Sequence, residues 1–90
     1  MKIFKYQLET TDLQQIEMPE GAIILCLQTQ NGKHCIWAMV QPENKLVKRS
    51  LEIFGTGHNI PDSGERKYIG TYQLSSGLLV FHCFELIKLK

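Results

Sequence analysis

Between Ala22 and Val40 the sequence reads AIILCLQTQ-NG-KHCIWAMV. Two runs of mostly apolar residues flank the dipeptide Asn31-Gly32. Asn-Gly is the preferred centre of a two-residue type I′ hairpin turn, because both of its residues must adopt positive φ. The segment therefore predicts a β-hairpin whose register is set by its turn.

This register assigns every residue of the two arms to a face of the sheet. The predicted pairs on one face are Gln30–Lys33, Gln28–Cys35, Cys26–Trp37 and Ile24–Met39, and on the other Thr29–His34, Leu27–Ile36 and Leu25–Ala38. Both faces are apolar away from the turn, which is typical of strands that are covered on both sides. We expect the hairpin at the centre of a sandwich or barrel, or with one face covered by another subunit.

The rest of the chain reads as further short strands. Alternation of apolar and polar residues, interrupted by turn residues, predicts strands over residues 2–8, 13–18, 46–54, 68–74 and 78–86. A two-residue turn at Ser76-Gly77 would pair Tyr72 with Phe81 and Gly70 with Cys83. The prediction is one all-β domain over residues 1–90, a small antiparallel meander of six to seven strands that forms a compact sandwich or partly open barrel.

Composition limits the partners and the cellular location that we expect for the protein. A formal net charge of +1 argues against a protein that coats nucleic acid, and no apolar run is long enough to span a membrane. The first residues, MKIFKY, lack the continuous apolar region of a signal peptide. Three cysteines, all within apolar runs, are typical of reduced thiols. We therefore expect a cytoplasmic protein.

The segment from Gly55 to Arg66, GTGHNIPDSGER, is the strongest candidate for a site. Irregular segments of this length inside a compact domain are usually functional or disordered. Glycines at alternate positions allow backbone amides to converge on an anion, and His and Arg side chains can add charge-assisted hydrogen bonds. The predicted ligand-binding residues are Gly55, Thr56, Gly57, His58 and Arg66. The alternative is a corner at a strand end, which is the stronger explanation of the glycines alone.

Other chemistries are less well supported. The dipeptides His34-Cys35 and His82-Cys83 lack the spacing of structural zinc sites, and adjacent strand residues point to opposite faces. No nucleophile elbow or fixed pair of carboxylates accompanies His58. We therefore expect neither an enzyme nor a metal or cofactor. Lys45, Lys48 and Arg49 are expected on a solvated strand face.

Six segments carry a family resemblance, namely FKYxLE, IEMPEGA, QNGKHCIWAMV, FGTGH, YIGTYQL and GLLVFHCFE. Together they extend from Phe4 to Glu85. The chain resembles a family of small, uncharacterised proteins encoded by phages and prophages. The resemblance implies a bacterial cytoplasm during infection as the working environment, and it transfers no catalytic residues.

These observations lead to two functional hypotheses. The first is a non-enzymatic binding module, a homo-oligomer that sequesters an anionic, nucleotide-type ligand, which in a phage setting implies a role against host defence. The alternative is an inhibitor or assembly component that binds a host or phage protein through an apolar sheet face.

Overall fold

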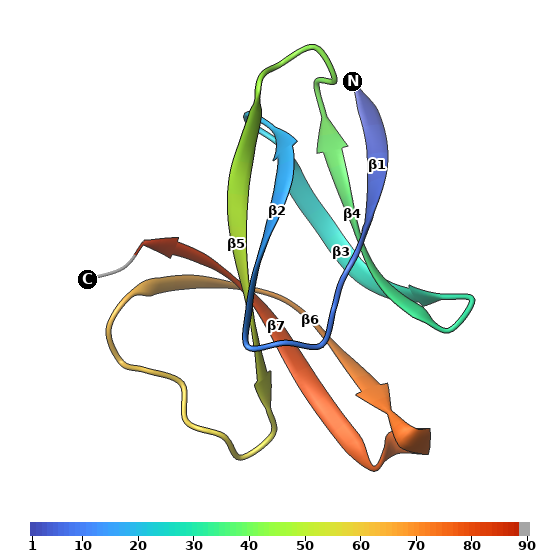
Figure 1. The fold of residues 1–90 in the computed structure, drawn as a ribbon, viewed down its shortest axis with the longest axis vertical. Coiled ribbons are helices and arrows are strands. Elements are labelled where there is room, and N and C mark those ends of the chain that lie inside the picture. Colours follow the sequence, from blue (N-terminus) through green and yellow to red (C-terminus); the bar gives the residue numbers. More distant parts are fainter. Residues whose placement is uncertain (89–90) are drawn as a thin grey trace.

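In the computed structural model, which describes residues 1–88, the chain forms seven β-strands (Figure 1). They are β1 (Lys2–Gln7), β2 (Leu13–Pro19), β3 (Ile23–Gln30), β4 (Lys33–Val40), β5 (Leu46–Gly55), β6 (Glu65–Leu74) and β7 (Leu79–Lys88), with one 3-10 turn, η1 (Ser75–Gly77). No helix in this part of the chain is long and apolar enough to cross a membrane. The predicted all-β class is confirmed.

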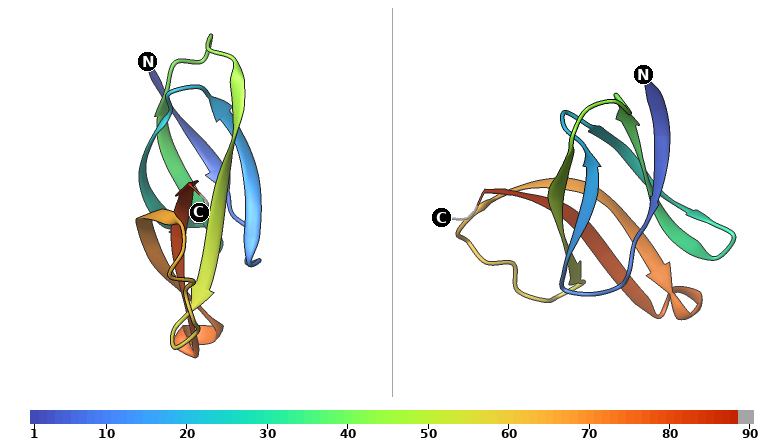
Figure 2. Two further views of the ribbon diagram at one scale, coloured as in Figure 1. Left: turned by 90° about the vertical axis from the view of Figure 1, so that its left-hand side faces the viewer. Right: turned by 45° about the horizontal axis from the view of Figure 1, so that its top comes forward.

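The strands form two antiparallel sheets that stack as two layers (Figure 2). One has the order β1-β4-β3 and the other β2-β5-β7-β6, and the sheets do not close into a barrel. Only β3–β4 and β6–β7 are neighbours both in the chain and in a sheet, so the order is not that of a simple meander. The connections after β1, β2 and β4 pass from one sheet to the other. Each sheet therefore pairs strands that lie far apart in the sequence.

The first hairpin has the predicted turn. Asn31 and Gly32 adopt φ values of 51° and 76°, as a type I′ turn requires. The predicted pairs from Gln30–Lys33 to Cys26–Trp37 are confirmed.

Beyond Cys26 the predicted register is wrong. A bulge at Leu25 shifts the pairing, so that Ile24 lies opposite Ala38 and Ile23 opposite Met39. An extra residue in one strand reverses which side chains point inward from that point on. Ile24 consequently packs against the core, whereas Leu25 stays exposed at the bulge.

The second hairpin has the predicted pairs Tyr72–Phe81 and Gly70–Cys83. Its turn is wider than the predicted two residues, because Ser75 and Ser76 adopt positive φ within η1. β6 also begins before the predicted strand, and it carries a bulge at Ile69. The irregular loop after β5 is thereby reduced to residues 56–64.

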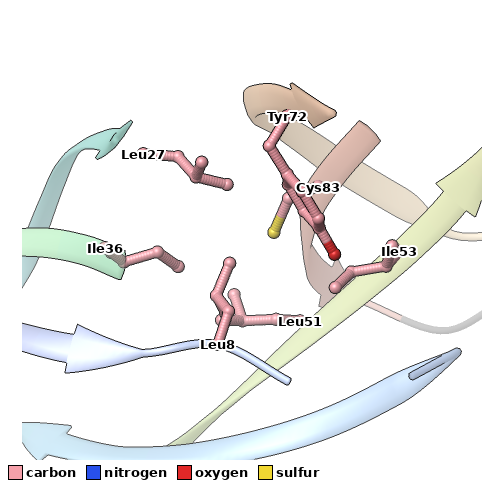
Figure 3. Close-up of a cluster of buried hydrophobic side chains, with 7 residues drawn as sticks. All are labelled: Leu8, Leu27, Ile36, Leu51, Ile53, Tyr72 and Cys83. Carbon is pink, nitrogen blue, oxygen red and sulfur yellow. The ribbon is translucent and has the colours of Figure 1, made fainter. Parts of the chain in front are cut away.

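Apolar side chains from both sheets meet in the interior (Figure 3). One buried cluster consists of Leu8, Leu27, Ile36, Leu51, Ile53, Tyr72 and Cys83. A second consists of Met18, Ala22, Ala38 and Val40. Ile16 and Ile24 pack against both clusters, so the interior is continuous between the layers.

The outer face of the three-stranded sheet carries one apolar row. Ile3, Met39 and Ile23 form one row across β1, β4 and β3, and Ile3 and Ile23 are 59% and 47% exposed. No part of residues 1–88 covers this row. The hairpin is therefore not covered on both sides by its own chain, and cover by another subunit stays a prediction.

The two sheets come closest where β3 runs beside β6 (Figure 1). A Cβ added to Gly70 of β6 would lie 2.9 Å from the Cβ of Leu27 in β3. This is closer than two such carbons can approach, so glycine is required here for the sheets to meet.

The substitution Gly70→Ala tests this requirement. Because the Leu27 Cβ is fixed to its backbone, the sheets would have to move apart, and we expect a loss of about 1–3 kcal/mol in the free energy of unfolding. Gly55→Ala is a matched control: its Cβ would also meet an atom at 2.9 Å, but that atom belongs to the movable ring of His58. Urea unfolding measures both variants, and an equal loss in the two would contradict the requirement.

Candidate functional site

Four of the predicted ligand-binding residues form a tight turn after β5. The amide of His58 donates to the carbonyl of Gly55 at 3.0 Å, and Gly57 has a φ of 87°. The amide of Thr56 donates to the carbonyl of Val80 at 3.1 Å. These two amides are engaged within the chain, so the turn does not offer them to an anion. The geometry fits a corner at a strand end.

The side chains of this turn lie in two different environments. The ring of His58 lies over Gly55 and forms a wall of three shallow depressions, two of which Asp12 also lines. The hydroxyl of Thr56 contacts Nε2 of His82 at 2.7 Å. His58 is thus accessible at the rim, whereas Thr56 attaches the loop to β7.

Arg66 holds the other end of the loop. Its Nε donates to Oε1 of Glu52 at 2.6 Å, and its Nη1 donates to the carbonyls of Pro61 and Ser63 at 3.1 and 2.8 Å. The Arg66 side chain is only 10% exposed, and it lines none of the depressions beside His58. Gly55, Thr56 and His58 therefore line one depression together, whereas Gly57 and Arg66 line none of the three.

The two His-Cys dipeptides are separated by packing. His34 stacks on Tyr72 and contacts the hydroxyl of Thr29. Burial, with a smaller contribution from Glu85, raises the pKa of the Cys83 thiol to about 12, which keeps it protonated at neutral pH. Within residues 1–88 no three His, Cys, Asp or Glu side chains gather to hold a metal ion.

A deeper hollow lies between the sheets, where the edges of β3 and β6 diverge. We call it the inter-sheet cleft. Its volume is about 370 Å³, and its lining residues are Ala22, Ile23, Ile24, Leu25, Arg49, Lys67, Tyr68, Ile69 and Glu85. Both bulged residues, Leu25 and Ile69, lie in this lining. Bulges locally disrupt strand pairing and are common beside functional sites.

The cleft contains an ion pair in the interior of the sandwich. Arg49 lies on the same face of β5 as the buried residues Leu51 and Ile53, and Glu85 lies on the same face of β7 as Cys83. Both oxygens of Glu85 accept from Arg49, one from Nε and the other from Nη2 at 3.0 Å. The hydrogen bond from Arg49 to Glu85 raises the pKa of Arg49 above its ordinary value. The guanidinium is therefore charged and fixed in orientation.

Arg49 is also held by the backbone, because its Nη1 donates to the carbonyl of Ala22 at 2.8 Å. These three hydrogen bonds engage three of the five N–H groups of the guanidinium. Lys67 lies opposite Glu85 in the ladder but forms no ion pair within residues 1–88. Two basic side chains thus face the cleft with donors to spare.

The predicted solvated face over Lys45, Lys48 and Arg49 is wrong for Arg49. Lys45 and Lys48 are exposed, whereas the Arg49 side chain is 21% exposed and bound to Glu85. Alternation with Val47, Leu51 and Ile53 already places Arg49 on the inward face of its strand. This signal could have identified Arg49 as a functional candidate.

Tyr68 forms one lip of the cleft. Its ring packs edge-on against Phe84, with 5.4 Å between centroids, and its hydroxyl lies 2.5 Å from that of Thr71. Thr71 in turn contacts Nδ1 of His82 at 2.9 Å. The ring is therefore anchored at both ends although Tyr68 is 55% exposed.

Removing half of the ion pair should destabilise the fold more than removing all of it. Glu85→Gln keeps the shape but leaves the Arg49 charge without a counter-ion, and we expect a loss of about 2–4 kcal/mol. The double variant Arg49→Met/Glu85→Leu replaces both charges with apolar groups and should return to within about 1 kcal/mol of the wild type or exceed it. Urea unfolding distinguishes the two.

The exposed pair Lys45–Glu20, at 3.8 Å, provides the control. Because water screens this pair, Glu20→Gln should cost less than about 1 kcal/mol. A Glu85→Gln variant no less stable than Glu20→Gln would show that the buried pair does not depend on its counter-charge.

A comparison with protein-family models matches residues 1–90 to the family described as "Domain of unknown function (DUF7352)". No curated protein and no solved structure matches the chain. The match covers the whole sequence, and the chain belongs to the DUF7352 family.

Proposed function

We propose that the protein is a non-enzymatic binding module that holds a small anionic ligand of nucleotide type in the inter-sheet cleft. The observation that carries this proposal is the largely buried pair of Arg49 and Glu85 in the lining of the cleft, with the exposed Lys67 beside it. The ligand site therefore differs from the Gly55–Arg66 segment expected from the sequence.

Charged residues are costly at such positions. An apolar replacement of a buried ion pair is often neutral or stabilising, so a buried pair is weak evidence for a purely structural role. In a small domain the margin of stability is narrow. A pair that opens onto a cleft and leaves Arg49 donors free is better explained by recognition of an anion.

The remaining walls suit the body of a small organic ligand. Ile24, Leu25 and Ile69 provide apolar surface beside the charged side chains, and Tyr68 lies at the rim with its ring packed on the outward face of β6 and β7. Small-molecule sites combine apolar surface with a few fixed polar groups.

The lining favours binding over catalysis. Glu85 supplies the carboxylate of the cleft, and both of its oxygens already accept from Arg49. A general base must reach the proton that it removes, and Glu85 is not free to do so. If the phage setting implied by the resemblance applies, such a module would sequester a nucleotide signal in the bacterial cytoplasm.

Amide chemical shifts test the proposal. In a titration with a panel of small carboxylates, phosphates and nucleotides, a ligand should move the amide signals of residues 22–25 and 67–69 in the wild type. The variant Arg49→Met/Glu85→Leu should keep its fold and lose these shifts, because the anion loses its fixed donors. Shifts confined to residues 55–58 would place the site in the loop instead, and no saturable shifts with any compound would refute the proposal.

One observation favours the second candidate, a protein-binding module. The exposed row of Ile3, Met39 and Ile23 is an apolar sheet face that the chain leaves open. Contiguous exposed apolar surface marks interaction sites. The partner would be a host or phage protein, or a second copy of the chain in a homo-oligomer.

A charge introduced into this row by substitution tests the proposed role in protein binding. Ile3→Glu should abolish self-association in sedimentation velocity, or the retention of a stoichiometric protein partner, because a carboxylate would be buried without a counter-ion. Leu78→Glu is the control, since Leu78 is 84% exposed and lies in the turn beside η1. A wild type that is monomeric and retains no partner would contradict this candidate.

A further inference from the structure

We infer that the ligand of the inter-sheet cleft carries one negative charge, in a carboxylate or phosphodiester group, on an apolar body. This inference rests on the proposed function and specifies its ligand class. It excludes phosphate monoesters and polyphosphates as the preferred ligands.

The charges of the lining set the charge of the ligand. Arg49 and Lys67 are cations and Glu85 is an anion, which leaves the cleft with one net positive charge. Arg49 and Glu85 compensate each other, so the exposed Lys67 supplies the uncompensated charge at the cleft. A monoanion neutralises the cleft, whereas a dianion would leave one negative charge in excess.

The position of Glu85 strengthens this limit. Glu85 is only 6% exposed, and its carboxylate is held by Arg49, which lines the same cleft. A second negative charge on the ligand would lie beside this carboxylate in a partly desolvated space. Like charges at such distances repel strongly when water is scarce.

The geometry of Arg49 suits an oxyanion with two acceptor oxygens. Two of its N–H groups remain after the bonds to Glu85 and Ala22, and a guanidinium favours paired donation to two oxygens. Carboxylates and phosphodiesters both present two such oxygens. Lys67 then acts as a point charge beside Glu85 on the same sheet.

Size and polarity describe the rest of the ligand. A volume of about 370 Å³ lies at the small end of the range for ligand pockets. The apolar residues Ile24, Leu25 and Ile69 line the cleft. An apolar body would contact these walls, whereas a chain of phosphates would not.

Two matched pairs of compounds test the inference by calorimetry. The first pair is 2-naphthoate and 2-naphthyl phosphate, which share a ring system but carry one and about two charges at about pH 8. The second is cyclic AMP and AMP, which share a base and sugar and differ in the same way. In whichever pair binds, the monoanion should bind at least about tenfold more tightly than the dianion.

Lys67→Glu should reverse the charge of the cleft and abolish binding of the monoanion. Lys33→Glu changes the protein's net charge equally but lies beside the Asn31-Gly32 turn, outside the lining of the cleft. The affinity of this variant for the monoanion should stay within about threefold of the wild type, because surface charges are screened by salt. The neutral compound 2-naphthamide should bind weakly to all three proteins.

The outcomes separate this inference from the proposed function. Dianions that bind as tightly as their monoanionic partners, or more tightly, would overturn the inference while leaving an anion site in place. Equal loss of affinity in Lys67→Glu and Lys33→Glu would also overturn it. The proposed function itself fails if no compound of the titration panel gives saturable shifts in the cleft.

Discussion

The contact between Leu27 and Gly70 is the constraint on which the arrangement of the two sheets depends. At this point the edges of β3 and β6 touch, and a side chain on Gly70 would not fit. Immediately beyond it both strands are bulged, at Leu25 and at Ile69. The edges therefore meet without forming a ladder, and the space that opens beside the contact is the inter-sheet cleft.

Local signals predicted the local structure well. The Asn31-Gly32 turn and the pairs nearest to it followed from the requirement for positive φ. The predicted pairing of β3 with β4 was wrong beyond Leu25. A bulge depends on tertiary contacts of the strand, and the alternation of apolar and polar residues does not reveal it. The alternation of residues in β5 was enough to predict that Arg49 points inward, but its partner Glu85 lies 36 residues away in the sequence. Such long-range pairs cannot be read from spacing.

The two part-buried Arg–Glu pairs have different roles because they lie on different faces. Arg66 and Glu52 lie outside the core cluster, and Arg66 binds carbonyls of the loop that follows β5. Arg49 and Glu85 lie on inward faces and border the cleft. The glycine-rich loop drew attention in the sequence because it is irregular, and Arg66 binds two of its carbonyls. The inward pair likewise joins β5 to β7 and to the carbonyl of Ala22, and it also borders the cleft.

Stability and recognition place opposite demands on the cleft. A small sandwich would gain by filling this space with apolar side chains and by pairing β3 with β6, since both changes would remove exposed edges and buried charge. The chain instead combines two bulges, a required glycine and three charged side chains in one region. Several independent departures from good packing at one place are expected at functional sites. Their coincidence is the strongest reason to look for function between the sheets and not in the loop.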